Sequence, residues 1–537
     1  MSLNLNLLGV VGLVCLVCYH LIQQWRHNGK LPPRPPGLPL IGNVLQYVPA
    51  AKNLSLHLLL NKWARQYGEI FRVKLGPVTI YYLNSDAAVK ELMDRKSAST
   101  SERPNWIEAN DIMTNSWNVL FLQASDPRWK HQRKITHSEL TSPVRADAGL
   151  PFLYYETAKF IYETSVDQDA GTDQQNLWAQ IGRYTYSTFA LQTLGLEIKS
   201  THDPNIDYIH DSGLEYIKAT IPGSYIVDTF PFLQKLPLTL KPWERKGRDL
   251  FLDNLKWAIK LKDQLMSGGS TAPNAKETML YRILTDEKRL GFASEEEASY
   301  LNLMLIQGAA DTSKMSTMSF LEAMITFPEV QRKAQEEIDR VVGDRVPVWE
   351  DLQNLPYVRC MMKEVWRWRP PVALGHPHVT TRDLEYKGML IPKGSRLHIN
   401  AWAIQHDPSR HEDPDAFMPE RYAHDHATAQ QSINSPDVAD RDHFAFGSGR
   451  RICPGVHVAE RSLSVSIMRI LWSFNVVVAP RAKLPLNPMD YPGAMFGNPG
   501  SHLPACLVVR SVEKKKLIEK NWEEERVRFE NSKSRRA

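Results

Sequence analysis

The residues best suited to chemistry lie near the C-terminus, in the loop Phe446-Gly-Ser-Gly-Arg-Arg-Ile-Cys453-Pro-Gly455. Its glycines permit backbone angles and close approaches that a side chain would block. The apolar residues that follow are spaced as on a helix, which places Cys453 near a helix N-terminus. Backbone N–H groups and the helix dipole favour a thiolate there, and a thiolate can be the axial ligand of a haem iron. Arg451 would then pair with a haem propionate, and Phe446 would pack beside the sulfur.

The competing interpretation is an inert cysteine in a glycine-rich loop, and it loses weight because three further motifs precede the loop. The first is Glu364-Val-Trp-Arg367, in a helix expected from about 355 to 368. Residues three apart share a helix face and can form an ion pair. Surface helices carry many such pairs and each contributes little. The pair gains meaning from the Pro-Glu-Arg421-Tyr segment that follows it.

The second motif, Gly308-Ala-Ala-Asp311-Thr312, lies in a helix predicted over residues 294 to 327. A Ser-x-x-Glu pattern at 294 to 297 fits a capping box, and about 33 residues would span about 50 Å. The Thr312 hydroxyl is expected to bond the carbonyl of Gly308 and loosen the helix locally. Small residues at 308 to 310 leave room for a diatomic ligand, to which Asp311 and Thr312 would relay protons. A core helix with small packing residues is the alternative.

The third motif is Trp129-Lys-His-Gln-Arg133, whose ends share one helical face. An indole N–H and a guanidinium placed in this way would share a propionate carboxylate. Basic residues around the expected proximal face form either a solvated surface or a docking patch for an acidic protein. These residues are Lys130, Arg133, Lys134, Arg450 and Arg461.

The cysteine loop and the order of the motifs closely resemble the cytochromes P450, from the proline-rich stretch to about Val512. The overall pattern, including Asn400-Ala-Trp-Ala-Ile404, is similar to P450s of filamentous-fungal secondary metabolism. The resemblance implies a haem b ligated by Cys453, with Asp311 and Thr312 catalytic and Glu364, Arg367 and Arg421 in a buried structural network. The implied cofactor-binding residues are Trp129, Arg133, His378, Phe446, Arg451, Cys453 and Gly455. This chain has Gly308-Ala309 where the family more often has Ala-Gly.

The resemblance implies a haem-thiolate monooxygenase that uses O2 to hydroxylate or otherwise oxidise a lipophilic small molecule, such as a polyketide, terpenoid or alkaloid intermediate. Only about 84 residues follow Cys453, too few for a flavin or nicotinamide module. Electrons are therefore expected from a separate NADPH-cytochrome P450 reductase, a flavoprotein, with cytochrome b5 as an optional partner. Two rivals are an isomerase or dehydratase that does not use O2, and a catalytically silent binding protein. The acid-alcohol pair and the intact cysteine loop argue against them.

The predicted fold is mainly α with small β-sheets, as one haem domain over residues 41–512. Strands are expected near 69–75, 79–82, 384–391 and 396–400.

The 65 basic and 60 acidic residues give a net charge of +5, which does not indicate nucleic-acid binding. Five cysteines form no CxxC pair in the folded part, which fits a reducing compartment.

Residues 1–25 are predicted to form a transmembrane anchor, because residues 7 to 22 are mostly apolar and basic residues follow. No clear cleavage site supports the competing signal peptide, and the short apolar run would need tilt or local thinning of the bilayer. Residues 26–40 form a proline-rich hinge similar to that of microsomal P450s. The expected location is the endoplasmic reticulum membrane, with the catalytic domain in the cytosol. The charged tail, 513–537, is expected as a helix or as disorder, and most simply as a solvated extension.

By family analogy, a hydrophobic substrate pocket is expected. Ordinary core packing explains each of its segments equally well when taken singly. The expected segments are residues 106–122, 221–233, Met304 with Gln307, 372–374 and 495–496.

Overall fold

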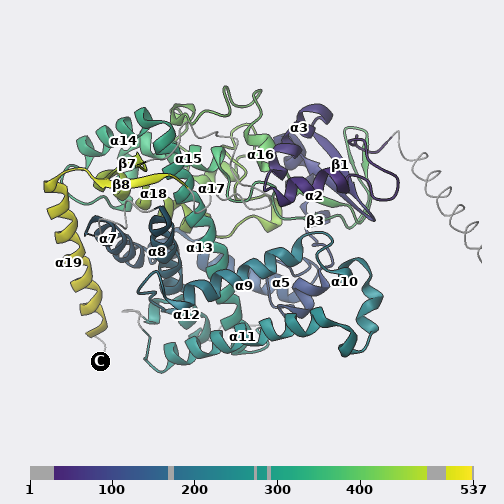
Figure 1. Ribbon diagram of the computed structural model, residues 1–537, viewed down its shortest axis with the longest axis horizontal. Coiled ribbons are helices and arrows are strands. Elements are labelled where there is room, and N and C mark those ends of the chain that lie inside the picture. The colour runs from purple at the N-terminus through teal and green to yellow at the C-terminus, as the bar shows by residue number, and fades with distance from the viewer. Residues whose placement is uncertain (1–29, 167–173, 271–274, 287–291, 481–502, 535–537) are drawn as a thin grey trace, which may run out of the picture.

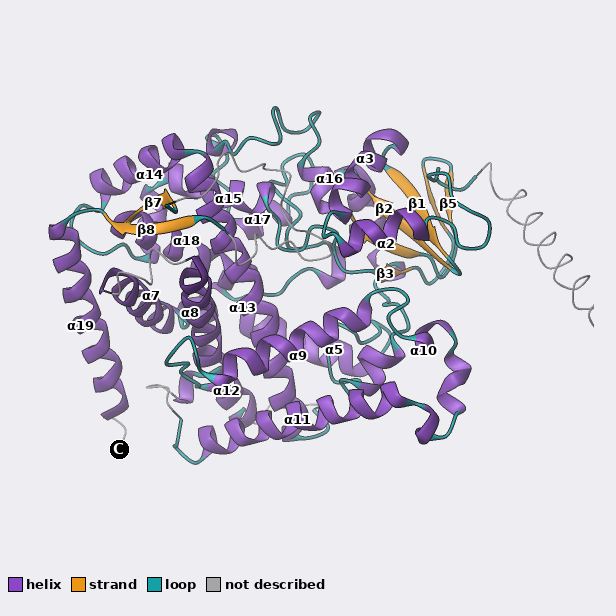
Figure 2. Cartoon of the chain, viewed as in Figure 1, coloured by secondary structure: helices purple, strands orange, loops and turns teal. Residues whose placement is uncertain are grey.

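The computed structural model describes residues 30–534 except 167–173, 271–274, 287–291 and 481–502. Helices dominate and the sheets are small, as predicted (Figure 2). The predicted anchor lies outside the described residues, and no helix within them is both long and apolar enough to cross a bilayer.

Four helices pack against one another in the left half of Figure 1. They are α7 (Leu150–Val166), α8 (Gln174–Leu194), α13 (Glu295–Thr326) and α18 (Val456–Ser473). The apolar residues after the cysteine loop, among them Leu463 and Ile467, are buried on α18, as their spacing predicted. The same core includes α14 (Pro328–Val341) and α15 (Pro356–Trp368). The cysteine loop therefore leads directly into a helix, α18, that is packed into this core.

Helix α13 is the predicted long helix, with 32 residues and a length of about 48 Å. Ser294 caps its start by accepting a hydrogen bond from Glu297 N at 3.3 Å. The reciprocal bond of a capping box does not form, because the Glu297 carboxylate accepts from Ala293 N at 2.8 Å and from the Gln132 amide at 2.9 Å. The predicted capping box is therefore half correct, and Glu297 instead ties α13 to the helix that carries Trp129 and Arg133.

The remaining α-helices lie before α13 or after α15 in the sequence. Those before α13 are α2 (Val44–Lys52), α3 (Leu56–Tyr67), α4 (Asp86–Val89), α5 (Pro127–Leu140), α6 (Pro143–Asp147), α9 (Pro204–Thr220), α10 (Ile226–Thr229), α11 (Pro242–Met266) and α12 (Met279–Thr285). Those after α15 are α16 (Ala401–Gln405), α17 (Ala429–Ile433) and α19 (Val512–Ser534). Helices α9 and α11 pack against α13.

The largest sheet has the strand order β1-β2-β6-β3. Its strands are β1 (Ile70–Leu75), β2 (Val78–Leu83), β3 (His378–Val379) and β6 (Arg396–Ile399), and β2 pairs with β6 in parallel. The strand expected over 384–391 is instead a hairpin of β4 (Leu384–Tyr386) and β5 (Met389–Ile391), which turns at Lys387 and Gly388. The pair of β7 (Phe474–Val478) and β8 (Ala505–Val509) was not predicted. The backbone bridge between Val379 and Glu102 places His378 beside residues 100–102.

The charged tail is a docked helix, so the expectation of a solvated extension is wrong. Helix α19 packs along α7 at the left edge of Figure 1. Phe529 stacks on Tyr155 with ring centroids 3.7 Å apart, and Trp522 stacks on Tyr162 at 5.7 Å. The helix has a charged outer face and a narrow aromatic inner face, which the density of charged residues in its sequence conceals.

Candidate active site

Cys453 lies at the predicted place, just before the N-terminus of α18. Its backbone N donates to Phe446 O at 2.9 Å, which closes the loop, and Gly455 N donates to its sulfur at 3.4 Å. Burial raises the pKa of the Cys453 thiol, while the Gly455 N–H and Arg133 lower it. A bound metal ion would deprotonate the thiol outright, so the loop is shaped to present one sulfur ligand to a cavity.

Two of the three loop glycines are required by the backbone. Gly447 and Gly449 have φ of +73° and +68°, and a Cβ on Gly449 would lie 2.0 Å from Met93 O. Gly455 has φ of −87° and room for a Cβ 3.7 Å from the cysteine sulfur. The prediction that it permits an unusual backbone is therefore wrong.

Two residues that the sequence analysis missed hold this loop in place. Asp94 accepts hydrogen bonds from Gly449 N at 2.8 Å and from the Ser448 hydroxyl. Arg441 donates to the Ser448 hydroxyl at 3.0 Å and lies over the Phe444 ring at 4.2 Å. No local pattern identifies Asp94, since 355 residues separate it from Gly449.

Three arginines converge on the cavity beside Cys453. Arg133 donates to Ile452 O, and Arg451 donates to Ser101 O at 2.6 Å while lying 4.7 Å from the Trp129 ring centroid. Arg103 donates to Pro377 O at 2.6 Å and to Leu120 O at 2.8 Å. None of the three makes an ion pair with a carboxylate in the described part of the chain.

Their burial without counter-ions is electrostatically costly. It lowers the pKa of all three guanidiniums, that of Arg451 to about 9. A ligand with two carboxylates would relieve this cost. The site therefore fits a haem, with the Cys453 sulfur for its iron and the three arginines for its propionates. Arg103 was missed because a lone loop arginine carries no spacing signal.

His378 also faces this cavity. Its Nδ1 donates to Thr100 O at 2.7 Å, since a carbonyl oxygen can only accept. Burial and the neighbouring Arg103 hold the pKa of His378 well below its usual value. A carboxylate in the cavity would favour the imidazolium and its second N–H donor, which is compatible with the predicted contact to a propionate.

The acid and alcohol of α13 face the same cavity. The Thr312 hydroxyl donates to Gly308 O at 2.8 Å, as predicted. No atom outside the local helix lies within 4 Å of where a Gly308 Cβ would be, so the wall is open at that point.

Asp311 has partners that the sequence did not reveal. Tyr186 on α8 donates to Asp311 Oδ1 at 2.7 Å, and His210 Nδ1 on α9 lies 3.3 Å from the same oxygen and 3.0 Å from the Tyr186 hydroxyl. Burial and the Asp311 charge raise the pKa of Tyr186, which keeps it a donor. Because its one proton points to Asp311, its oxygen accepts from His210, whose side chain is 35% exposed. The three groups thus form one hydrogen-bonded cluster at the wall of the cavity.

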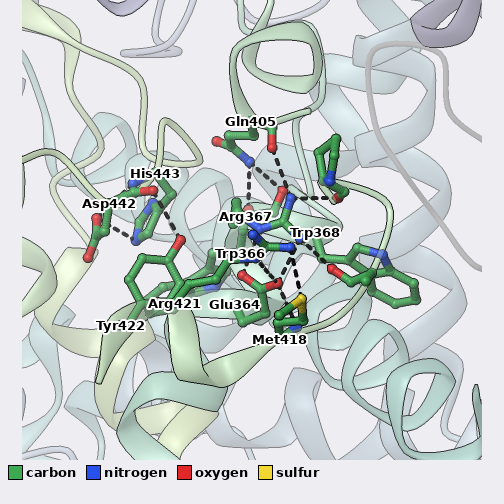
Figure 3. A network of polar contacts seen from close by, with 12 residues as sticks. Glu364, Trp366, Arg367, Trp368, Gln405, Met418, Arg421, Tyr422, Asp442 and His443 are labelled. Carbon is green, nitrogen blue, oxygen red and sulfur yellow. Dashed lines mark hydrogen bonds and ion pairs between the residues drawn. The ribbon is translucent and has the colours of Figure 1, made fainter. Parts of the chain in front are cut away.

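Glu364, Arg367 and Arg421 meet in one buried network (Figure 3). Arg367 donates to both Glu364 oxygens at 2.6 and 2.7 Å, and Arg421 donates to Glu364 Oε1 at 3.2 Å. Arg367 also donates to three backbone carbonyls between 2.8 and 3.0 Å. The network joins α15 to the segment around η8 (Pro419–Tyr422).

The cavity has a volume of about 650 Å³. Of the predicted pocket segments, Met304 and Gln307 line it, but only residues 118–121 of 106–122 and Val372 of 372–374 do so. The predicted segment 221–233 does not, because it runs over the surface with several exposed apolar side chains. Helix α9 takes its place, through Gly213, Tyr216, Ile217 and Thr220. The spacing of these residues is helical, and that signal was available in the sequence. Residues 495–496 lie outside the described residues.

The predicted proximal basic patch is smaller than expected. Lys130, Lys134 and Arg450 are exposed. Arg133 points into the cavity, and Arg461 is buried and paired with Asp147 at 2.6 Å. Of the five basic residues predicted for this patch, three are therefore exposed and free to contact a partner protein.

The comparisons with known proteins agree with this geometry. The model of the cytochrome P450 family matches residues 32–503. The chain is 52% identical over 499 residues to a cytochrome P450 monooxygenase of Gibberella fujikuroi, covering 92% of this chain and 90% of that protein. It is 36% identical over 471 residues to the cytochrome P450 monooxygenase virE of Hypocrea virens, covering 87% and 82%. A zebra fish cytochrome P450 structure with abiraterone shares the fold, with a TM-score of 0.65 and 22% identity over 85% of this chain and 100% of that one.

Proposed function

Because the chain belongs to the cytochrome P450 family and is a monooxygenase, as its relatives are, we propose that it oxidises a lipophilic intermediate of fungal secondary metabolism. The observation that carries this proposal is the single cavity that joins the Cys453 sulfur, an unneutralised arginine cluster and the Asp311-Thr312 pair. The wall around these groups is mostly apolar, which suits a lipophilic substrate.

When bound, the haem supplies an iron that activates O2, with the Cys453 thiolate donating electron density that favours O–O cleavage. Arg103, Arg133 and Arg451 neutralise the propionates. Thr312 holds a hydroxyl on the cavity wall beside Gly308 of α13, and Asp311 delivers protons towards it. Tyr186 and His210 fix the orientation of Asp311 through their contacts with its Oδ1.

The electrons come, in this proposal, from a separate NADPH-dependent flavoprotein reductase. Lys130, Lys134 and Arg450 are exposed on elements next to the cysteine loop and suit an acidic partner. A monooxygenase needs this supply, whereas the rival isomerase or dehydratase would turn over without NADPH. The presence of Asp311 and Thr312 on the cavity wall favours the monooxygenase.

We also infer attachment to the endoplasmic reticulum membrane. Exposed apolar side chains occur on two neighbouring parts of the surface, around α2 and around α10, at the right of Figure 1. They are Leu38, Leu40, Ile41, Leu45, Val48 and Leu54 in the first, and Ile221, Ile226, Phe230, Phe232, Leu238 and Leu240 in the second. Together with the apolar N-terminal run, they support a lipid-facing side.

The test of the haem-thiolate assignment is a carbon monoxide difference spectrum of the reduced full-length protein. A strongly red-shifted Soret band is expected, absent in Cys453→Ala and moved to the position typical of histidine ligation in Cys453→His. Cys360→Ala, which removes a buried thiol outside the cavity lining, should leave the band in place. A histidine-type band in the wild-type protein would overturn the proposal.

A further inference from the structure

One buried amide in the cavity has a donor that meets no strong acceptor among the described residues. Asn118 precedes α5, is 5% exposed and lines the cavity. Its Oδ1 accepts from Leu120 N at 2.9 Å, which establishes which end of the amide is oxygen. Its Nδ2 donates only to the sulfur of Met304, at 3.0 Å. Thioether sulfur is a weak acceptor, so the stronger hydrogen bond of this amide is still to be made.

Asn118 faces the part of the cavity that a substrate would occupy. Met304, Gly308 and Thr312 are spaced four apart and share one face of α13. Met304 therefore lies about 6 Å along the helix axis from the open turn at Gly308 and about 12 Å from Thr312. The Asn118 amide contacts the Met304 end of this row, on the cavity wall.

The side-chain amide of Gln307 also lines the cavity, but unlike that of Asn118 it donates to oxygen acceptors. Gln307 Nε2 donates to the Ser212 hydroxyl at 2.7 Å and to Ile209 O at 3.2 Å. Its donors are therefore used to join α13 to α9. Nearby cavity residues such as Phe121, Phe189 and Ile217 are apolar. In a mostly apolar pocket, a few placed polar groups fix the orientation of the ligand, and Asn118 is a buried donor in this wall that meets no oxygen acceptor among the described residues.

We propose that Asn118 is a specificity-determining residue that donates a hydrogen bond to an uncharged oxygen of the substrate. The substrate class is then a lipophilic molecule with at least one carbonyl or hydroxyl oxygen, and not a pure hydrocarbon. A carboxylate is excluded, because a single amide would not offset the cost of burying its charge in an apolar wall. This inference rests on the proposed function, since it needs the haem to hold the reacting position.

The test uses probes anchored on the iron, so that each of them reports binding. The purified holoprotein is titrated with 4-phenylimidazole and with derivatives that carry an acetyl or an ethyl group at the meta or the para position. The shift of the Soret band is the readout. An acetyl group and an ethyl group have similar shapes and differ in one carbonyl. At one or both positions, the acetyl probe should bind about tenfold more tightly than its ethyl counterpart.

Three variants separate the donor from the fold. Asn118→Leu should remove the preference for acetyl, and Asn118→Asp, which replaces the donor by an acceptor, should reverse it. Met304→Leu removes the competing sulfur and should retain or increase the preference. Each variant is first checked for an unchanged carbon monoxide spectrum, which excludes misfolding.

The two proposals fail in different ways. If the reduced wild-type protein gives no thiolate-type carbon monoxide band, the haem-thiolate assignment fails. If it gives that band but acetyl is not preferred at either position, or if Asn118→Leu keeps the preference, the role of Asn118 is wrong and the proposed function stands.

Discussion

Thr312 and Thr317 make the same contact on the same helix and differ in what they face. Their hydroxyls donate to Gly308 O at 2.8 Å and to Ser313 O at 3.0 Å, one turn back in each case. Thr312 lines the cavity, whereas Thr317 is 2% exposed and packed in the core. The pair therefore separates the effect of a hydroxyl on the helix from its effect on the chemistry.

We predict that Thr312→Ala lowers the product formed per NADPH consumed by about a hundredfold, at the lower end of what a positioned proton donor contributes. Hydrogen peroxide should rise correspondingly, because the loss is in proton delivery and not in electron supply. Thr317→Ala should leave both ratios at their wild-type values. Equal effects of the two substitutions would show that the helix, and not the cavity hydroxyl, is responsible. Both products are measured in a reductase-coupled assay.

Glu108 is a buried acid with a strongly raised pKa, and it lies outside the cavity. It is fully buried, and its carboxylate oxygens have no partner among the described residues. Burial, with Asp228 and Glu244 nearby, raises the pKa of Glu108 to about 8. Its backbone N donates to Asp228 Oδ1 at 3.1 Å, and burial raises the pKa of Asp228 to about 6. This backbone hydrogen bond joins η3 (Ile107–Ile112) to α10, and it leaves the Glu108 carboxyl buried without a partner among the described residues.

We predict that the protein loses stability as pH rises from about 4.5, the value for an unfolded glutamate, to about 8. The folded state holds the proton more tightly than the unfolded state, so this contribution is complete at low pH and lost above pH 8. One such group changes the free energy of unfolding by at most about 1.4 kcal/mol per pH unit. Glu108→Gln should therefore raise the urea midpoint at pH 8 much more than at pH 5. Glu350→Gln, at an exposed position, is the control, and a pH-independent difference would contradict the prediction.

The site residues that the sequence revealed are those in short motifs, such as Cys453 with its loop and Thr312 with Asp311. Those that it did not reveal are brought in by tertiary contacts. Arg103, Asp94 and Tyr186 are ordinary residues in their local context, and 125 residues separate Tyr186 from its partner Asp311. No spacing rule connects such pairs, because their distance is set by the packing of helices and not by a single element.

Among the elements, the long helix and the helix after Cys453 could be predicted because each carries its own periodicity, whereas the hairpin of β4 and β5 was expected as a single strand. The pairing of β7 with β8 could not, since the two strands lie far apart in sequence and neither has a turn that identifies its partner. Helix α19 was misjudged for another reason. A few aromatic residues among many charges are enough for docking when they fall on one side of a helix.

The docking of α19 gives a prediction for this element. Phe529 is 6% exposed and stacks on Tyr155, whereas Val527 on the same helix is 41% exposed. Phe529→Ala should lower the free energy of unfolding by about 3 kcal/mol, the lower end for a buried phenylalanine, and should speed proteolysis of the C-terminal segment. Val527→Ala should change neither quantity measurably. Chemical denaturation and limited proteolysis of the full chain would check both, and equal effects would place α19 in solvent.

For the protein as a whole, two ends of the long axis differ in character. The exposed apolar residues around α2 and α10 lie towards one end, and the charged α19 lies at the other (Figure 1). A membrane-bound enzyme would turn the first end to lipid and the second to water.

We predict that hydrogen exchange of the full chain slows in residues 38–54 and 221–240 when it is moved from detergent to lipid nanodiscs. Burial in the headgroup region would exclude water from those backbone amides. Residues 512–534 serve as the internal control and should exchange at the same rate in both. Slowing in α19 instead, or no slowing in either apolar segment, would remove the support for a lipid-facing side.

The network of Glu364, Arg367 and Arg421 has a consequence for how such a sequence can change over evolutionary time. Replacing Glu364 or Arg367 leaves a buried charge without its partner, at a cost of about 3–5 kcal/mol against a total stability of only about 5–15 kcal/mol. A lineage that drifts one substitution at a time must therefore pass through a variant close to unfolding before it reaches any uncharged alternative, even one that would be equally stable. The three residues therefore persist because the single substitutions that would start to replace them are too destabilising, and not only because of what they contribute to the fold.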